Sequence, residues 1–548
     1  MSKIKKLLSI GLLGLSVFVD SSEECSSSNC ESPISQNLWQ PHAFSGYALQ
    51  DILILQGLDC QKDQGDWVNR FGFVTEYMQN FGKDCQSLGA MPFWSGTNTM
   101  TIGNHDGKAD LDAYQFGMGD VVTDADGIAG TITLNPQVQH VGTEFLWYIM
   151  QNEDKPGFYA KVKAPLGAMM VTSSICESPI ELAEESEPSP YPQELLRFTS
   201  LGQALHGGYY NQDPLYSYGK LACNKRTVIR LGDIAAVVGA NFVAKEHGHI
   251  GVGVKVSCPT GNVPQAQYML EPIFGRAGHW GVGAELSAHY THVSDKDSCA
   301  SGAWTVWAQA ELLHLFDGRQ PSWRSFDLKA NGPGSRYLLV QRYAYQDSTF
   351  GFQPQGIHPV INVTTLPVHS SFAMEGNFAV LLDYTRNQWN ISLGGEFWGR
   401  STEKLSIDCC RPLQDRDQGF LDYNLNDYAV LGRQLVPSGI ASIYWCEPLA
   451  RINESLPTYN NQGPVPAGIK DPTVSANRIP ADYNEALDIC GAAAKRIFTG
   501  KVLGEIGYTW SDNGHVPHLS VFAGAELADK KSHWVNLWSV GLQASLQF

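Results

Sequence analysis

The sequence predicts an all-β protein, a closed antiparallel transmembrane β-barrel of about twelve strands. Three observations lead to this prediction. The final strand alternates strictly between apolar and polar residues, and earlier segments show the same period of two. Short and long connections between these segments also alternate along the chain. Alternation with a period of two gives a strand one apolar and one polar face. Bilayer-spanning barrels combine such strands with short turns on one side and long loops on the other.

The last strand carries the clearest pattern. Every second residue counted back from Phe548 is apolar: Leu546, Ala544, Leu542, Val540 and Trp538. The residues between them are polar or glycine: Gln547, Ser545, Gln543, Gly541 and Ser539. The segment has about the ten residues that a tilted strand needs to cross a bilayer. Its terminal phenylalanine resembles the signal by which Gram-negative outer-membrane barrels are recognised, which implies the barrel assembly machinery as a partner. Taken alone, the segment could also end a soluble β-sandwich.

Eleven earlier segments alternate in the same way. With the last strand, the candidates are 71–82, 138–150, 157–174, 227–243, 248–258, 277–293, 301–314, 372–385, 388–402, 500–511, 516–528 and 533–548. Two shorter segments, 98–103 and 130–135, could add a hairpin and raise the number to fourteen. Aromatic residues near the strand ends suit a belt at the membrane interface; they are Tyr290, Trp304, Tyr508, Trp510, Trp534 and Trp538.

The connections give independent information. Short ones fall at 151–156, 244–247, 294–300, 386–387 and 512–515, and long ones at 83–137, 175–226, 259–276, 315–371 and 403–499. The two kinds alternate, which tandem β-sandwiches do not predict and barrels with long extracellular loops do. The last connection, 529–532, is short where a long one is expected.

The amino terminus predicts export. A basic lead, a short apolar core and a polar region occupy residues 1–22, as in a secretory signal peptide. We expect residues 23–63 to form a periplasmic lead or a plug, with a short helix in SGYALQDILILQG, and residues 64–548 to form the barrel. No later stretch approaches eighteen consecutive apolar residues, so no transmembrane helix is expected.

Composition excludes several classes of function. The net charge of −17 argues against nucleic-acid binding. The twelve cysteines of an exported chain predict disulfides, whose pairing stays open. No C-x-x-C pair, Walker loop, G-x-S-x-G or H-E-x-x-H motif is present, so we expect neither a metal centre, nor a cofactor, nor an enzyme. An Asp-rich loop at 106–126 lacks the calcium-loop spacing and is interpreted as solvated.

Charged residues on the inner face of the strands are the candidate site. Those expected to line the lumen and set its selectivity are Arg230, Lys255, Glu285, Glu311, Glu396, Glu505 and Glu526, with Glu144, Lys161, Lys163 and Glu375 on the same face. In a water-filled lumen the excess of glutamates predicts a preference for cations. In a plugged lumen the same residues would form structural salt bridges, and both interpretations stay open. A short repeat with a glycine just before a glutamate recurs at 283–286, 394–397, 503–506 and 524–527, with the sequences GAEL, GGEF, LGEI and GAEL.

Residues 231–262, LGDIAAVVGANFV…HGHIGVGVKVSCPTGN, resemble a strand pair of the phenol-degradation and fatty-acid-transport-like outer-membrane proteins. The resemblance covers less than a tenth of the chain and implies a barrel that passes small, hydrophobic solutes. The cysteine content instead resembles the disulfide-bridged envelope porins of chlamydia-like bacteria. We therefore expect a porin-like channel of the Gram-negative outer membrane, in contact with its lipid and passing small solutes, with loop 403–499 narrowing it. The alternatives are a disulfide-stabilised structural envelope protein or adhesin, and a transporter of small hydrophobic compounds.

Overall fold

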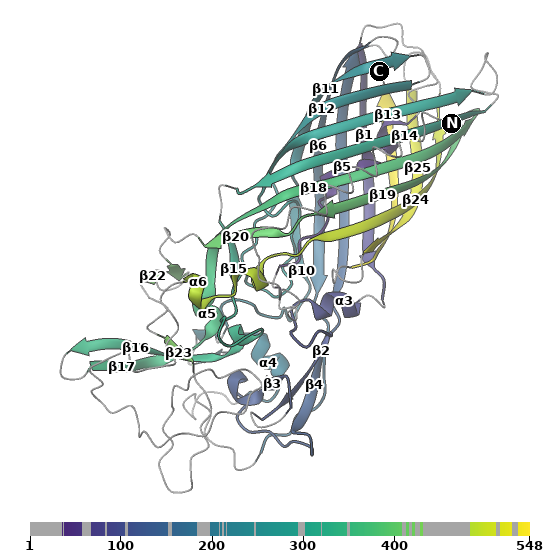
Figure 1. Cartoon of the computed structure of the whole chain (residues 1–548). Helices are drawn as coiled ribbons and strands as arrows, with labels where there is room; N and C mark the ends of the chain where they lie inside the picture. Colours follow the sequence, from purple (N-terminus) through teal and green to yellow (C-terminus); the bar gives the residue numbers. More distant parts are fainter. Residues whose placement is uncertain are drawn as a thin grey trace.

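A computed structural model shows a barrel with a folded domain at one end (Figure 1). It describes the chain from Gln36 to Gln547 except residue 37 and the stretches 57–66, 83–84, 105–107, 152–155, 184–197, 208, 211–212, 215, 246–247, 294–301, 319–320, 348–350, 408–412, 416–418, 422–427, 431–482, 511–515 and 529–534. The predicted signal peptide, Phe548 and most of loop 403–499 lie outside the described residues.

Twelve antiparallel strands form the barrel wall: β1 (Trp67–Asn80), β5 (Gln137–Gln151), β6 (Gly157–Thr172), β11 (Ile234–Lys245), β12 (Gly248–Cys258), β13 (Trp280–Val293), β14 (Ala303–Phe316), β18 (Thr365–Arg386), β19 (Trp389–Arg400), β24 (Ile497–Thr509), β25 (Val516–Ala528) and β26 (Leu537–Gln547). Each pairs with its neighbours along the chain, β26 returns to β1, and β5–β6 and β6–β11 complete the closure. The prediction of a closed, all-β barrel of twelve strands is confirmed.

The two ends of the barrel differ as the connections predicted. Strands β5–β6, β11–β12, β13–β14, β18–β19 and β24–β25 are joined by short turns at one end, here called the turn end. The carboxyl-terminal end of β26 lies there too, because Gln547 is opposite Arg70 at the start of β1. The longer connections, among them 81–136, 173–233, 259–279, 317–364 and 401–496, leave from the other end, here called the loop end.

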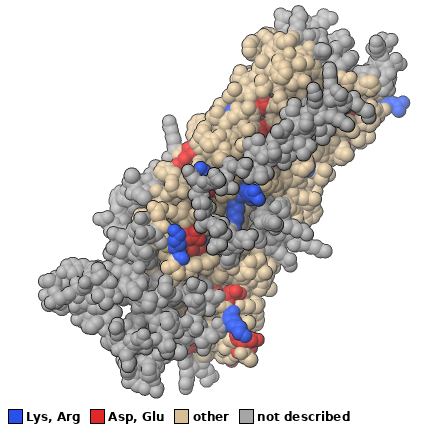
Figure 2. Space-filling view, viewed as in Figure 1, with Lys and Arg blue, Asp and Glu red and all other residues tan. Residues whose placement is uncertain are grey.

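The outer face of the barrel is apolar. Along β12, Val252, Val254 and Val256 are exposed, whereas Gly253, Lys255 and Ser257 between them are buried. Tyr290, Trp304 and Trp510 are exposed near the turn end, as a membrane-interface belt requires. Figure 2 shows few charged side chains on the barrel surface in view, while several lie toward the loop end. The exterior is therefore suited to lipid and the interior is polar.

The loop end carries a folded domain. It contains a four-stranded sheet, β3 (Leu111–Asp112), β2 (Thr99–Gly103), β4 (Ile128–Leu134) and β7 (Ile175–Glu177). Its other elements include α3 (Cys85–Ala90), η3 (Ala113–Phe116), α4 (Leu201–Leu205), β8 (Tyr209–Tyr210), β9 (Asp213–Pro214), β10 (Arg226–Leu231), β15 (Ser322–Ser325), η5 (Ser335–Tyr337), β16 (Leu339–Asp347), β17 (Gly351–Pro359), α5 (Val360–Thr364), β20 (Glu403–Ile407), β21 (Leu413–Asp415), β22 (Gly419–Leu421), β23 (Tyr428–Val430), α6 (Tyr483–Ala486) and α7 (Ile489–Ala492). Phe93, Phe116, Tyr216 and Leu338 belong to its apolar core.

The fourteen-strand alternative is wrong. The expected hairpin does form, since β2 pairs with β4, but its sheet lies outside the barrel. Its strands have five and seven residues, fewer than the nine or so that a tilted strand needs to span a bilayer.

The amino-terminal segment fills the barrel. Residues 38–56, here called the plug, include η1 (Phe44–Gly46) and α2 (Ala48–Leu55), and every residue of both elements is buried. Among the described residues, no helix is long and apolar enough to cross a membrane.

The predicted disulfides are not observed where the structure can show them. Cys176, Cys223 and Cys258 carry free thiols. Seven further cysteines lie outside the described residues: Cys25, Cys30, Cys60, Cys299, Cys409, Cys410 and Cys446.

Candidate functional site

Six of the seven residues expected to line the lumen are buried inside the barrel: Lys255, Glu285, Glu311, Glu396, Glu505 and Glu526. Arg230 does not lie in the lumen, because β10 extends past the end of β12 and pairs only with β6. At that level the barrel wall is incomplete beside β10, and Arg230 is exposed there. The sequence pattern missed this because it treated 227–243 as one strand, whereas the strand is interrupted at 232–233 between β10 and β11.

The plug helix α2 receives its amino-terminal cap from the wall. Tyr47, the residue before the helix, offers no side-chain cap. Instead, the Glu396 carboxylate on β19 accepts hydrogen bonds from the backbone N–H groups of Ala48 at 2.8 Å and Leu49 at 3.3 Å. These are two of the N–H groups that a helix leaves without internal partners, and a negative charge there also complements the helix dipole. Glu396 thus holds the helix by its end.

Glycines in the wall let the plug approach closely. A Cβ atom at Gly142 on β5 would lie 3.0 Å from the Phe44 ring, and one at Gly394 on β19 would lie 2.8 Å from a Leu49 methyl carbon. Any larger side chain at these positions would push the plug inward. Gly394 belongs to the short repeat G-G-E-F at 394–397, so the glycine and the glutamate of this repeat both contact the start of α2.

At mid-barrel, one acidic residue of the plug meets two lysines of the wall. The Asp51 carboxylate lies 2.7 Å from Lys161 Nζ and 2.6 Å from Lys163 Nζ, both on β6. Gln309 on β14 donates to it at 2.8 Å. All four side chains are at most 2 % exposed, so these contacts are screened very little by water.

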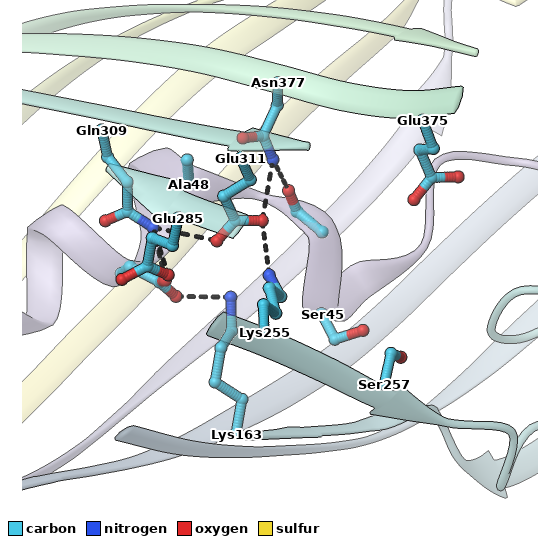
Figure 3. A network of polar contacts seen from close by, with 12 residues as sticks. Ser45, Ala48, Lys163, Lys255, Ser257, Glu285, Gln309, Glu311, Glu375 and Asn377 are labelled. Carbon is cyan, nitrogen blue, oxygen red and sulfur yellow. Dashed lines mark hydrogen bonds and ion pairs between the residues drawn. The ribbon is translucent and has the colours of Figure 1, made fainter. Parts of the chain in front are cut away.

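The same network continues around the wall. Lys161 also pairs with Glu285 on β13 at 2.6 Å, and Lys255 on β12 pairs with Glu311 on β14. Figure 3 shows Lys163 and Lys255 pointing into the lumen beside Gln309, Glu285 and Glu311, which come from the neighbouring strands β13 and β14. Oxygens of Asp51, Glu285 and Glu311 lie within 4.8 Å of one another, close enough to hold a cation. The adjacent lysine ammonium groups already supply that positive charge, so the arrangement fits ion pairing rather than a metal centre.

A second cluster lies on the opposite wall. Lys501 on β24 pairs with Glu76 on β1 at 2.7 Å, and Gln50 of the plug donates to the same glutamate at 2.6 Å. Tyr47 donates to Glu526 on β25 at 2.7 Å, and Lys501 Nζ lies 4.1 Å from the Tyr47 ring centre. The plug therefore contributes a partner to the charged residues on both sides of the lumen.

An arginine also contacts the plug at each of its ends. At the loop end, Arg276 from the 259–279 connection donates to Glu375 on β18 at 2.7 Å and to Ser45 at 3.0 Å. At the turn end, Arg70 on β1 donates to the carbonyl oxygens of Ile54 at 3.0 Å and Gln56 at 2.5 Å.

The space left beside the plug is small. A cavity of about 20 Å³ lies between α2 and strands β5, β6, β12, β13 and β14, lined in part by Leu55, Tyr148 and Trp307. A second cavity of about 10 Å³ lies beside His42 and Tyr47. Each has room for little more than a water molecule. Neither cavity leaves room for a solute beside the plug.

Sequence reasoning missed several members of this site. Asp51, Glu76, Gln309 and Lys501 were not selected. Asp51 is nevertheless the single charged residue of a mostly apolar run, ALQDILIL, and Glu76 and Lys501 occupy inward positions of alternating strands. The single acid in the run is the signal that could have identified Asp51.

No protein-family model matches the chain, and no curated protein matches it. Among solved structures it is similar to an outer-membrane channel of Pseudomonas putida F1, with 10% identity over 89% of this chain and 100% of that one and a TM-score of 0.34. A FadL homologue of Pseudomonas aeruginosa shows 9% identity over 88% and 89% of the two chains, TM-score 0.26. A mutant of the monoaromatic hydrocarbon channel TodX shows 9% identity over 94% and 97%, TM-score 0.27. At these values the similarities carry no functional conclusion for this chain.

Proposed function

We propose that this protein is a gated channel of the Gram-negative outer membrane, exported by its signal peptide, which passes small solutes when the plug leaves the lumen. It works without a cofactor and without covalent chemistry. Its apolar exterior and charged interior suit a wall between lipid and water.

The observation that carries this proposal is how the plug is held. The wall strands are hydrogen-bonded to one another around the barrel, and among the described residues α2 makes no backbone-to-backbone hydrogen bond to them. It is held by side chains such as Glu396, Lys161 and Arg70. The plug can therefore leave without breaking any wall ladder, and the open barrel keeps its backbone pairing.

The opened lumen would prefer cations. Its buried wall carboxylates outnumber its buried wall bases: Glu76, Glu144, Glu285, Glu311, Glu375, Asp383, Glu396, Glu505 and Glu526 against Arg70, Lys161, Lys163, Lys255, Arg400 and Lys501. An excess of acidic groups along a water-filled pore raises the local concentration of cations.

The test is planar-bilayer conductance of the refolded mature protein under a salt gradient. Cation-selective steps support the proposal. The double variant Glu285→Gln, Glu396→Gln should shift the reversal potential toward zero, whereas Asp126→Asn on the exposed surface of the loop-end domain should leave it unchanged. An unchanged potential in the double variant would remove these glutamates from the selectivity argument. Silence from folded wild-type protein and from plug-loosening variants alike would refute the channel.

One observation favours transport of small hydrophobic compounds as a second candidate. Toward the turn end, beside β5 and β14, the interior carries an apolar cluster in which Leu146, Tyr148, Met150 and Trp307 of the wall pack with residues of α2. Uptake of an uncharged aromatic compound by cells carrying the protein, faster than uptake of a small cation, would favour this candidate over a cation-preferring pore.

A further inference from the structure

The environment of Asp51 has the composition of a carboxylate-binding site. Two ammonium groups, Lys161 Nζ and Lys163 Nζ, and one amide N–H group, that of Gln309, converge on a single carboxylate at 2.6–2.8 Å. The Lys161 and Gln309 contacts are charge-assisted hydrogen bonds, the strong class of hydrogen bond, and the Lys163 contact is an ion pair. All three donors belong to the wall and the acceptor belongs to the plug, so the site and its occupant are on separable parts of the chain.

The site loses its nearest anion when the plug leaves. Lys161 keeps Glu285 at 2.6 Å, but the next carboxylate to Lys163 is Glu144, whose oxygen is 3.6 Å away. Lys163 is fully buried in the plugged state. In this docked state a buried lysine strongly favours a close negative partner, which Asp51 supplies. The departure of Asp51 therefore creates a place for another carboxylate.

The residues around Asp51 also indicate what the rest of a bound solute would be like. The next residue, Ile52, and Leu55 one turn later border the 20 Å³ cavity together with Tyr148, Tyr159 and Trp307. Apolar plug side chains thus lie against aromatic wall residues directly beside the carboxylate contacts. A solute that replaced this part of the plug would have one carboxylate and an apolar body.

We propose that Lys161, Lys163 and Gln309 form a binding site for the carboxylate of a small solute with an apolar body, and that Asp51 occupies this site while the plug is docked. The proposal rests on the proposed function in that the plug must move for the solute to enter. The site is a local cluster of donors on β6 and β14 within a lumen whose wall is acidic overall, so solute carboxylate and cation can pass together.

The test measures binding of 4-fluorobenzoate to full-length protein in detergent by fluorine NMR, with 4-fluorobenzamide as the uncharged probe of the same shape. Asp51→Ala removes the competing carboxylate and should bind 4-fluorobenzoate at least tenfold more tightly than wild type. Adding Lys163→Gln should abolish that gain. Adding Lys501→Gln, which removes a lumen lysine outside the site, should keep it. The amide should bind every variant as weakly as it binds wild type. Thermal unfolding followed by circular dichroism checks that each barrel is folded.

Equal affinity of the folded Asp51→Ala protein for the two probes would overturn the proposal, as would a gain that survives Lys163→Gln. Because binding is measured without a membrane or a current, its result is separate from that of the channel test. A selective site in a protein that never conducts would support the carboxylate site and refute the proposed function. Conductance without a selective site would support the proposed function and refute the carboxylate site.

Discussion

Replacing Glu396 by alanine should release the plug. Glu396 is the residue through which β19 caps α2, and its carboxylate accepts the N–H groups of Ala48 at 2.8 Å and Leu49 at 3.3 Å. The substitution removes both contacts and leaves the β19 backbone pairing with β18 and β24 unchanged. It therefore weakens the docked state of the plug without a direct effect on the wall.

The size of the effect follows from these two contacts. A hydrogen bond to a charged group contributes ~1.5–3 kcal/mol, and the longer contact contributes less. The charge at the end of an eight-residue helix adds ~0.5 kcal/mol. Hydration of the carboxylate after undocking offsets part of this sum. We take a net loss of ~2–3 kcal/mol, which corresponds to a ~30–150-fold larger ratio of undocked to docked plug.

The assay is single-channel recording, in which the open probability of each variant is compared with wild type. Glu396→Gln keeps an amide oxygen as acceptor and should raise the open probability only ~5-fold, since it loses ~1 kcal/mol. Glu505→Ala is the matched control: Glu505 is a buried lumen glutamate whose carboxylate lies 3.9 Å from His518 Nε2 of the wall, and no contact of it with the plug is observed among the described residues. Folded Glu396→Ala protein that opens no more often than Glu505→Ala would refute the reasoning that this cap holds the plug.

Three further predictions concern other parts of the molecule. Gly142→Val should raise conductance, because a Cβ atom at position 142 would lie 3.0 Å from the Phe44 ring and displace the plug. Adding Phe44→Ala should return the conductance of the double variant to that of Phe44→Ala alone. An unchanged conductance in Gly142→Val would count against the close packing. In the loop-end domain, burial alone would raise the pKa of Glu403, but the Arg324 guanidinium at 2.7 Å holds that pKa below its usual range. This ion pair therefore adds stability above the ordinary pKa of a glutamate, which is lost as the pH falls through the lowered value. Glu403→Gln should lower the melting temperature at pH 7 and have less effect near pH 3, and an equal loss at both pH values would contradict this. On the outer face, Val254→Arg should reduce the free energy of folding into lipid vesicles by ~2–4 kcal/mol, as measured by denaturant titration, whereas a soluble exterior would tolerate it.

Much of the fold could be predicted because it rests on local patterns. Each of the twelve predicted strands overlaps one strand of the barrel, and the alternation along β12 and β26 assigned the correct residues to the outer face. Alternation survives in the folded state because neighbouring side chains on a strand always point to opposite faces. The error at Arg230 arose where this local rule was carried across an interruption, between β10 and β11.

The candidate site was predictable only in part. Inward glutamates could be named from strand parity, but their partners could not, because an ion pair such as Asp51–Lys161 joins residues 110 positions apart. Pairing at that separation depends on barrel curvature and strand register, which no short segment encodes. The cap that Glu396 provides for α2 likewise brings together residues 348 positions apart.

The sequence by itself determined that this chain forms a barrel, which face of each strand is apolar and at which end the long connections gather, but it left the number of strands open between twelve and fourteen. These properties follow from alternation and spacing along the chain. Only the tertiary structure decided that residues 38–56 fill the lumen and that its acidic residues are occupied by lysines and by the plug. The physical reason is that a charged lumen accepts either water or a complementary segment, and the choice depends on whether the partners meet at bonding distance.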